Sequence, residues 1–338
     1  MHKKTRVGIL FGGKSAEHEV SLQSAKSIIE AIDKEKYEVA LIGIDKQGRW
    51  YSPGKDLNQP SRFLSYGSLE AIDVVFPVLH GPFGEDGTVQ GLLKLADIPF
   101  VGAGVLGSAV GMDKDVMKRL LRDAGLPTAK FLVFNRSLKN KINFDKVVKE
   151  LGLPLFVKPA NLGSSVGINK VKSKDDFDYS VADAFKYDNK ILIEEFIKAR
   201  EIECSVLGNE DPIASLPGEI IPQHEFYAYE TKYIDDEGAI LKIPAELPDD
   251  TVKNIQELAI KTFKTLCCEG MGRVDFFLAD SGEILVNEIN TIPGFTKISM
   301  YPKLWEASGI SYKELIDRLI QLAIERHKRE CELQTSLS

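Results

Sequence analysis

Two apolar segments joined by a short turn sequence constrain the fold of this chain most. Residues 272–278 (Gly-Arg-Val-Asp-Phe-Phe-Leu) and 283–290 (Glu-Ile-Leu-Val-Asn-Glu-Ile-Asn) both have the composition of a buried strand. Between them lies Asp-Ser-Gly-Glu, in which glycine tolerates the positive φ of a tight turn. The pattern predicts an antiparallel hairpin with Ser281 and Gly282 as its two-residue turn.

This hairpin predicts a metal site on one face of the sheet. Its register places Asp275 opposite Glu288 and Arg273 opposite Asn290. Alternate residues of a strand share a face, so Glu288 and Asn290 point the same way. Three oxygen ligands are costly to bury on an apolar sheet without a bound charge, and hard oxygen ligands suit Mg²⁺. The alternative is a sheet face with solvated polar residues.

Length, composition and charge narrow the class of protein. A chain of 338 residues exceeds what one hydrophobic core usually serves, so we expect two or three domains. It is 43% hydrophobic and 28% charged, as in ordinary soluble proteins, and its net charge of -7 argues against general nucleic-acid binding. No signal peptide or membrane-spanning run is apparent. Four cysteines without metal-type spacing fit a reducing, cytoplasmic location: Cys204, Cys267, Cys268 and Cys331.

The first third of the chain alternates strand and helix patterns. We expect strands at 6–11, 37–44, 72–79 and 99–101, and helices at 19–32 and 88–96. This alternation predicts an α/β domain with a parallel sheet and ligands near its strand C-termini. Residues 57–69 read only as loop or short helix.

Beyond a boundary near residue 112, the order of elements changes. Asp113 can cap a helix at 114–123, and Gly125 and Pro127 follow that helix. Further strands are expected at 131–134, 155–158, 166–171 and 191–197, and a final helix at 312–328.

One motif near the N-terminus is an apparent phosphate loop. Residues 8–15 (Gly-Ile-Leu-Phe-Gly-Gly-Lys-Ser) match the pattern G-x-x-x-x-G-K-[ST]. In a true phosphate loop the first glycine ends the strand, whereas here Ile9, Leu10 and Phe11 continue it. We therefore interpret the motif as a glycine turn after a strand, which exposes the residues that follow, including Glu17.

Three later segments have the residues of a nucleotide site. Residues 158–167 form a Gly/Ser loop after Lys158, whose small residues allow backbone amides to approach phosphate. Residues 191–197 are an apolar strand that becomes polar at its end, which suits either an adenine site or a protected edge strand. Residues 222–233 contain three tyrosines, a phenylalanine and a lysine, typical of an active-site lid or of a surface hairpin.

Together these segments resemble the ATP-grasp superfamily, and within it the D-alanine–D-alanine ligases of peptidoglycan synthesis. The motifs appear in the family's order over nearly the whole chain, which makes the resemblance specific. They are residues 12–21, 80–87, 112–114, 158–159, 163–167, 226–233, 272–275 and 287–296.

The resemblance implies a three-domain ATP-grasp fold with an N-terminal parallel-sheet domain. The expected divisions are 1–112, 113–203 and 204–338. It also implies that ATP phosphorylates the carboxylate of one D-alanine and that the amine of a second D-alanine displaces phosphate. The implied cofactors are ATP and two Mg²⁺ ions, for which Mn²⁺ can substitute, and the implied assembly is a homodimer.

The resemblance also assigns roles to individual residues. It implies a triad of Glu17, Ser164 and Tyr233 that orients the first D-alanine, with His80 nearby, and Arg273 as the donor to the tetrahedral oxyanion. The second substrate's carboxylate is assigned to Ser299 and the Gly294 backbone. The metal ligands are Asp275, Glu288 and Asn290. The ATP contacts are Lys114, Lys158, Ser165, Glu194, Glu195, Phe196, Ile197, Glu201, Lys232 and Asn287.

Two other activities remain open at this point. A D-alanine–D-lactate ligase is the nearest alternative, but those relatives replace the lid tyrosine with a histidine-bearing loop, whereas Tyr233 stands here in a dipeptide-type sequence. A nucleotide-binding relative without turnover is disfavoured by the intact Arg273, Asp275 and Glu288.

Overall fold

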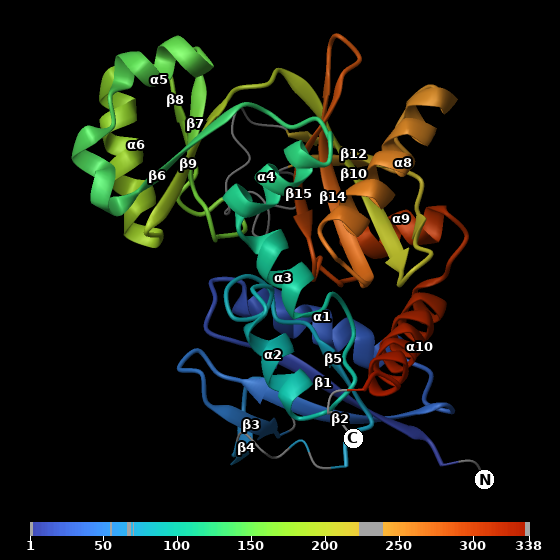
Figure 1. The fold of residues 1–338 in the computed structure, drawn as a ribbon. Coiled ribbons are helices and arrows are strands. Elements are labelled where there is room, and N and C mark those ends of the chain that lie inside the picture. Colours follow the sequence, from blue (N-terminus) through green and yellow to red (C-terminus); the bar gives the residue numbers. More distant parts are fainter. Residues whose placement is uncertain (1–2, 55, 66–68, 70, 223–238, 335–338) are drawn as a thin grey trace.

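The computed structural model describes residues 3–54, 56–65, 69, 71–222 and 239–334. They form three sheets with helices packed between and around them (Figure 1). Within these ranges, no helix is both long enough and apolar enough to cross a membrane.

The N-terminal sheet is parallel at its centre. Strand β1 pairs in parallel with β2 and β5, whereas β3 and β4 extend the sheet in antiparallel fashion. The strand order is β4 (Pro60–Phe63), β3 (Trp50–Pro53), β2 (Tyr37–Ile44), β1 (Thr5–Gly12) and β5 (Val74–Pro77). The expected parallel sheet is confirmed.

Helices cover both faces of this sheet because side chains alternate along β1. Val7, Ile9 and Phe11 pack in one core with α1 (His18–Ala31) and α10 (Tyr312–Cys331). Leu10 belongs to a second core that includes Val89 and Leu93 of α2 (Thr88–Leu95). Helix α10 is the last of the chain, yet it lies beside the N-terminal sheet (Figure 1).

The C-terminal sheet carries the hairpin. The path runs β13 (Ala239–Lys242), β12 (Gly218–Pro222), β10 (Ala199–Gly208), β14 (Gly270–Ala279) and β15 (Ile284–Asn290), and β11 (Ile213–Ala214) also pairs with β10. One core joins this sheet to Met117 and Leu121 of α4 (Lys114–Asp123) and to Ile255 and Phe263 of α8 (Asp249–Thr265). Two further helices, α3 (Val105–Met112) and α9 (Met300–Ala307), also lie next to this sheet.

A third, four-stranded sheet is antiparallel throughout. Its order is β6 (Phe131–Asn135), β9 (Lys190–Glu195), β7 (Leu155–Pro159) and β8 (Asn169–Val171). Its core is closed by α5 (Phe144–Leu151) and α6 (Lys174–Tyr187), and a 3₁₀ helix spans Arg136–Lys141. Strand β9 lies between β6 and β7, so the alternative that residues 191–197 form a protected edge strand is wrong.

Several other local expectations also need correction. Residues 57–69 include strand β4, because pairing with β3 rather than local propensity decides their conformation. Residues 166–167 belong to a turn and residue 168 is irregular, so the strand begins only at Asn169. Residues 99–101 contribute a single bridge between Val75 and Phe100 instead of a strand. By contrast, the strand at 37–44 and the helix at 114–123 are confirmed.

The phosphate-loop motif is a false match, as expected. Gly8 lies in the middle of β1, and the strand continues to Gly12. Gly12 and Gly13 both have positive φ, 91° and 97°, so the turn follows the strand. Lys14 stacks on the Phe83 ring, 5.4 Å from its centroid.

Candidate active site

The hairpin has the predicted pairing at the site. Asp275 lies opposite Glu288, and Arg273 lies opposite Asn290. The Asn290 amide nitrogen donates to Asp275 Oδ2 at 3.0 Å, so both side chains occupy one face. The expected clustering of these three oxygen-bearing side chains is therefore confirmed, while their role as metal ligands remains a prediction.

The turn differs from the two-residue turn predicted from sequence. Ala279 N–H donates to the Glu283 carbonyl and Gly282 N–H donates to the Ala279 carbonyl, both at 2.9 Å, which makes a three-residue loop. Gly282 supplies its left-handed position with φ 87°. The register then shifts between Asp275 and Phe276, which pairs with Val286.

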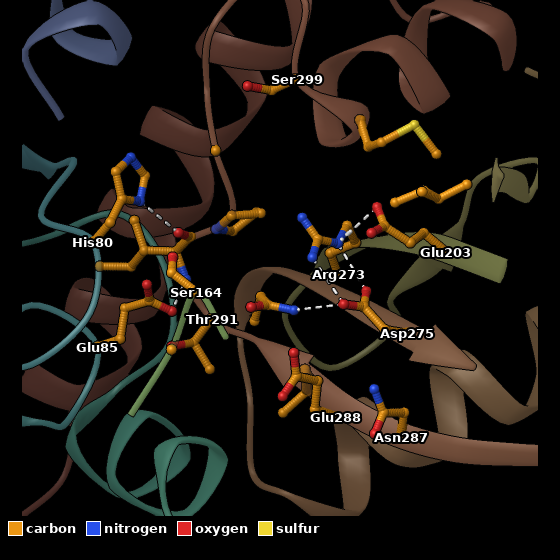
Figure 2. Close-up of a pocket in the computed structure, with 18 of the residues that line it drawn as sticks. His80, Glu85, Ser164, Glu203, Arg273, Asp275, Asn287, Glu288, Thr291 and Ser299 are labelled. Carbon is orange, nitrogen blue, oxygen red and sulfur yellow. Dashed lines mark hydrogen bonds and ion pairs between the residues drawn. The ribbon is translucent and has the colours of Figure 1, made fainter. Parts of the chain in front are cut away.

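That register shift is a β-bulge at Asn287. The extra residue restores the pairing of Asp275 with Glu288 and brings both Asn287 and Glu288 to the cavity wall (Figure 2). In a regular strand two successive side chains would point to opposite faces. The bulge thus adds a polar group to the cavity that a regular hairpin would turn away.

Arg273 is held between two carboxylates. Its Nε and Nη2 donate to the two oxygens of Asp275, each at 2.8 Å, and its Nε lies 2.9 Å from Glu203 Oε2 (Figure 2). Burial acts to lower the pKa of the guanidinium, but Asp275 and Glu203 outweigh it and hold that pKa well above its usual value. Arg273 is therefore a permanent, fixed cation in the cavity.

The hairpin forms one wall of a cavity of about 750 Å³. This volume is within the range of small-molecule sites. The remaining walls come from the N-terminal part, helix α4, the Gly/Ser loop, strand β10 and the segment after β15. They include Glu17, His80, Glu85, Lys114, Ser164, Glu201, Gly294 and Ser299.

Glu17 and the Gly/Ser loop meet in this cavity. A Cβ atom added to Gly81 would lie 2.8 Å from Glu17 Oε2, and one added to Gly163 would lie 3.6 Å from it. Ser164, beside Gly163, adopts φ 52°, an uncommon value for serine. Two members of the predicted triad thus face the same space. The third, Tyr233, lies outside the described residues, as does Lys232.

The predicted nucleotide contacts fall into two groups. Lys114, Glu201 and Asn287 line the cavity, and Lys114 Nζ lies 3.2 Å from Glu288 Oε2. Among the described residues, the cavity walls do not include Lys158, Ser165 or residues 194–197.

The second group is organised around a buried carboxylate. Glu194 forms ion pairs with Lys158 and with Lys118, whose Nζ lies 2.5 Å from Glu194 Oε1. Burial acts to raise the pKa of Glu194, but the two lysines prevail and lower it. Next to it, Glu195 Oε1 accepts the Lys130 N–H at 2.7 Å, and Phe196 lies under the Lys170 ammonium.

The segment after β15 contains the residues assigned to the second substrate. A Cβ atom on Gly294 would lie 3.0 Å from Ser299 Oγ, so the two residues are adjacent. Ser299 Oγ accepts the Thr296 N–H at 3.1 Å. Ser299 itself directly precedes helix α9. His80 also reaches this segment, because its Nδ1 lies 2.9 Å from the Ile292 carbonyl oxygen.

Sequence reasoning missed three charged residues around the cavity. Glu203 lies opposite Asp275 on β10, and its spacing of two from Glu201 was the available signal. Lys118 follows Lys114 by one helical turn on α4. Glu85 belongs to the glycine-rich segment after β5, and its place in the motif at 80–87 was the available signal.

The fold and this site together define an ATP-grasp ligase. Two antiparallel sheets follow the N-terminal α/β part, and clustered carboxylates on a hairpin face buried lysines and a fixed arginine. Residues 6–103 match the family model described as D-ala D-ala ligase N-terminus, and residues 120–321 match D-ala D-ala ligase C-terminus.

Individual relatives agree along the whole chain. The D-alanine–D-alanine ligase of Oceanobacillus iheyensis is 55% identical over 99% of both chains, and D-alanine–D-alanine ligase A of Salmonella typhimurium is 51% identical over 99% of this chain and 100% of its own. The solved D-alanine-D-alanine ligase from Coxiella burnetii has a TM-score of 0.85 at 40% identity, covering 97% of this chain and 96% of that one. The D-Ala:D-Ser ligase VanG from Enterococcus faecalis has a TM-score of 0.86 at 37% identity, covering 95% and 100%. The chain belongs to the D-alanine–D-alanine ligase family.

Proposed function

We propose that this protein joins two D-alanines to D-alanyl-D-alanine for peptidoglycan precursor synthesis, with ATP converted to ADP and phosphate. The observation that carries the proposal is a single cavity shared by Glu17 and Ser164, the Arg273 hairpin, and the Gly294–Ser299 segment. Each group matches one part of the reaction: the first D-alanine, the phosphoryl transfer, and the second D-alanine.

The proposed reaction has two steps. A carboxylate oxygen of the first D-alanine attacks the γ-phosphorus of ATP, and the bond to the β-phosphate oxygen breaks to release ADP. The amine of the second D-alanine then attacks the carbonyl carbon, loses a proton, and phosphate leaves with the electrons of its C–O bond. Arg273 would face the oxyanion of the tetrahedral intermediate, and Lys114 would reduce the repulsion between the carboxylate and ATP.

The donor set on the hairpin fits a divalent cation. Asp275, Glu288 and Asn290 offer oxygen ligands on one face, and the two carboxylates among them are paired with Arg273 and Lys114. When bound, two Mg²⁺ ions, or Mn²⁺ in their place, would neutralise the phosphate charge. We expect Glu288→Gln to fold normally and to lower turnover by at least about a hundredfold, because it removes one charge from the metal shell.

Turnover as a function of Mg²⁺ concentration measures this effect. The matched control is Glu283→Gln, at the exposed far end of the same hairpin, which should behave as the wild type. Unchanged turnover and unchanged Mg²⁺ dependence in Glu288→Gln would contradict the metal assignment.

The identity of the second substrate is tested by letting other nucleophiles compete with D-alanine. Purified protein is supplied with ATP, D-alanine and an equal concentration of D-serine or D-lactate, and the products are separated at several pH values. We expect D-alanyl-D-alanine to dominate over both competitors, and its share against D-lactate to increase as pH rises and more free amine is present. A dominant depsipeptide or D-alanyl-D-serine product would overturn the dipeptide assignment and keep the ligase class. ATP hydrolysis that does not require D-alanine would overturn the ligase reaction itself.

The setting of the reaction is also part of the proposal. We place the protein in the cytoplasm, where ATP is available, as a homodimer without nucleic-acid or membrane partners. The division into domains at 112 and 203 belongs to the same proposal. Sedimentation of the purified protein tests the dimer.

A further inference from the structure

The segment Ile292–Phe295 is bound at three backbone points by side chains of the N-terminal part. It follows β15 directly and contains Gly294, which the proposed function assigns to the second D-alanine. The three side chains are Ser24 on α1, and His80 and Glu85 in the segment after β5.

His80 and Ser24 form one continuous chain of hydrogen bonds. His80 Nδ1 must donate to the Ile292 carbonyl oxygen, 2.9 Å away, because a carbonyl only accepts. Burial lowers the pKa of His80 and favours the neutral ring, so Nε2 is an acceptor. Ser24 therefore donates its hydroxyl to Nε2 at 3.2 Å and accepts the Phe295 N–H at 3.3 Å.

Glu85 accepts a hydrogen bond from the backbone N–H of the same residue, Ile292. Its Oε2 accepts the Ile292 N–H at 3.4 Å, while its Oε1 accepts the Gly81 N–H at 2.9 Å. Glu85 thus ties the segment after β15 to the same glycine-rich segment that carries His80. The backbone of Ile292 is thus held at its N–H by Glu85 and at its carbonyl by His80, two residues of one N-terminal segment.

We propose that Ser24 and Glu85 are positioning residues that set the backbone of 292–295 and thereby build the site for the second D-alanine. The proposal rests on the proposed function, because that function assigns Gly294 and Ser299 to this substrate. Both residues act through the backbone and not by touching the reacting atoms. The N-terminal part then serves both substrates, the first through Glu17 and the second through these contacts.

The test measures a separate KM for each of the two D-alanines. Glu85→Gln keeps the size of the side chain but provides one acceptor where two N–H groups must be satisfied, and the kinetics are compared above about pH 8, where the Glu85 carboxylate is ionised and both its oxygens accept. Ser24→Ala removes the hydroxyl that links His80 to Phe295. Initial rates over a wide D-alanine range give one constant for each substrate site, and a separate series gives the KM for ATP.

Each variant has a matched control on its own element. Ser27→Ala lies on α1, where the Ser27 hydroxyl donates to the Gln23 carbonyl at 3.0 Å within the same helix. Asp86→Asn follows Glu85, and its carboxylate accepts the Phe83 and Thr88 N–H groups within its own segment. Both controls should leave the constant for the second D-alanine unchanged.

In Glu85→Gln and Ser24→Ala we expect the KM for the second D-alanine to rise about tenfold, because each variant loses one hydrogen bond to the backbone of this site. The KM for ATP should change by less than about twofold. Equal rises for both D-alanines and for ATP would indicate general loss of structure and overturn the proposal. An unchanged second constant would also overturn it. Failure of the proposed function is seen separately, in a wild-type protein that makes no D-alanyl-D-alanine.

Discussion

At the scale of single residues, the cavity combines fixed charges with buried neutral groups. Arg273 stays charged because two carboxylates surround it. His80 and Glu85 lie a few residues apart, and burial shifts both toward their neutral forms: it lowers the pKa of His80 and raises the pKa of Glu85 to about 8, with Glu17 adding to the rise. The same burial therefore has opposite effects on the two pKa values, because one group is a base and the other an acid.

The raised pKa of Glu85 predicts a pH-dependent difference in stability. Between its ordinary pKa of 4.5 and about 8, the folded protein holds a proton that the unfolded chain has released, so stability contributed by Glu85 falls as pH rises through this window. Glu85→Gln removes this dependence. We expect its Tm relative to the wild type to increase from pH 5 to pH 8 and to level off above.

The measurement is thermal unfolding of both proteins without ligands across pH 5 to 9. The loss of a hydrogen bond in the variant shifts its Tm at every pH, so the slope and not the offset carries the result. A Tm difference that stays constant across this range would show that Glu85 ionises normally.

At the scale of elements, the hairpin is built by two local irregularities that compensate each other. A three-residue loop around Gly282 changes the register by one residue, and the bulge at Asn287 changes it back. Asp275 therefore meets Glu288, as a two-residue turn would also have given. The bulge has a further effect, because it places Asn287 and Glu288 together at the cavity.

The loop predicts a backbone effect at Gly282. Its φ of 87° disfavours a side chain, and a Cβ atom there would meet nothing within 4 Å, so strain and not crowding decides the outcome. We expect Gly282→Val to lower stability by about 1–2 kcal/mol, and Gly282→Asn, which tolerates this conformation, to lower it less. Thermal unfolding of both variants measures the difference. Equal Tm values for valine and asparagine would contradict the left-handed loop.

At the scale of the whole molecule, the last helix joins the two ends of the chain. Helix α10 packs on the N-terminal sheet, and its buried Arg326 donates to the Phe100 carbonyl at 2.7 Å and the Gly102 carbonyl at 2.5 Å. The guanidinium also lies 4.5 Å from the Phe100 ring centroid. The position of the C-terminal helix thus depends on N-terminal backbone groups.

Arg326→Met tests this connection. Methionine keeps the apolar stem but leaves two buried carbonyl groups without donors, which we expect to cost about 2–4 kcal/mol. Arg318→Met on the same helix removes only an exposed ion pair with Glu314 and should change stability by less than about 0.5 kcal/mol. Denaturant unfolding compares the two. A similar loss of unfolding free energy in both variants would mean that the buried hydrogen bonds of Arg326 do not stabilise the protein.

The sequence by itself determined the features that depend on neighbours along the chain. The hairpin pairing of Asp275 with Glu288, the capped helix after Asp113, and the continuation of β1 through the false phosphate loop all follow from local periodicity and turn residues. Strand pairing across a short loop is local, so the hairpin can be predicted from the sequence, whereas its register at Asp275 agrees with the prediction because the three-residue loop and the bulge compensate each other.

Only the tertiary structure decided which distant residues share the cavity. Glu203 joins Arg273 through pairing of β10 with β14, Lys118 meets Glu194 across two elements, and Glu85 reaches Ile292 over most of the chain. Strand β4 likewise exists because β3 pairs with it. These contacts arise from the packing of whole elements, and no local pattern of residues records which elements will pack together.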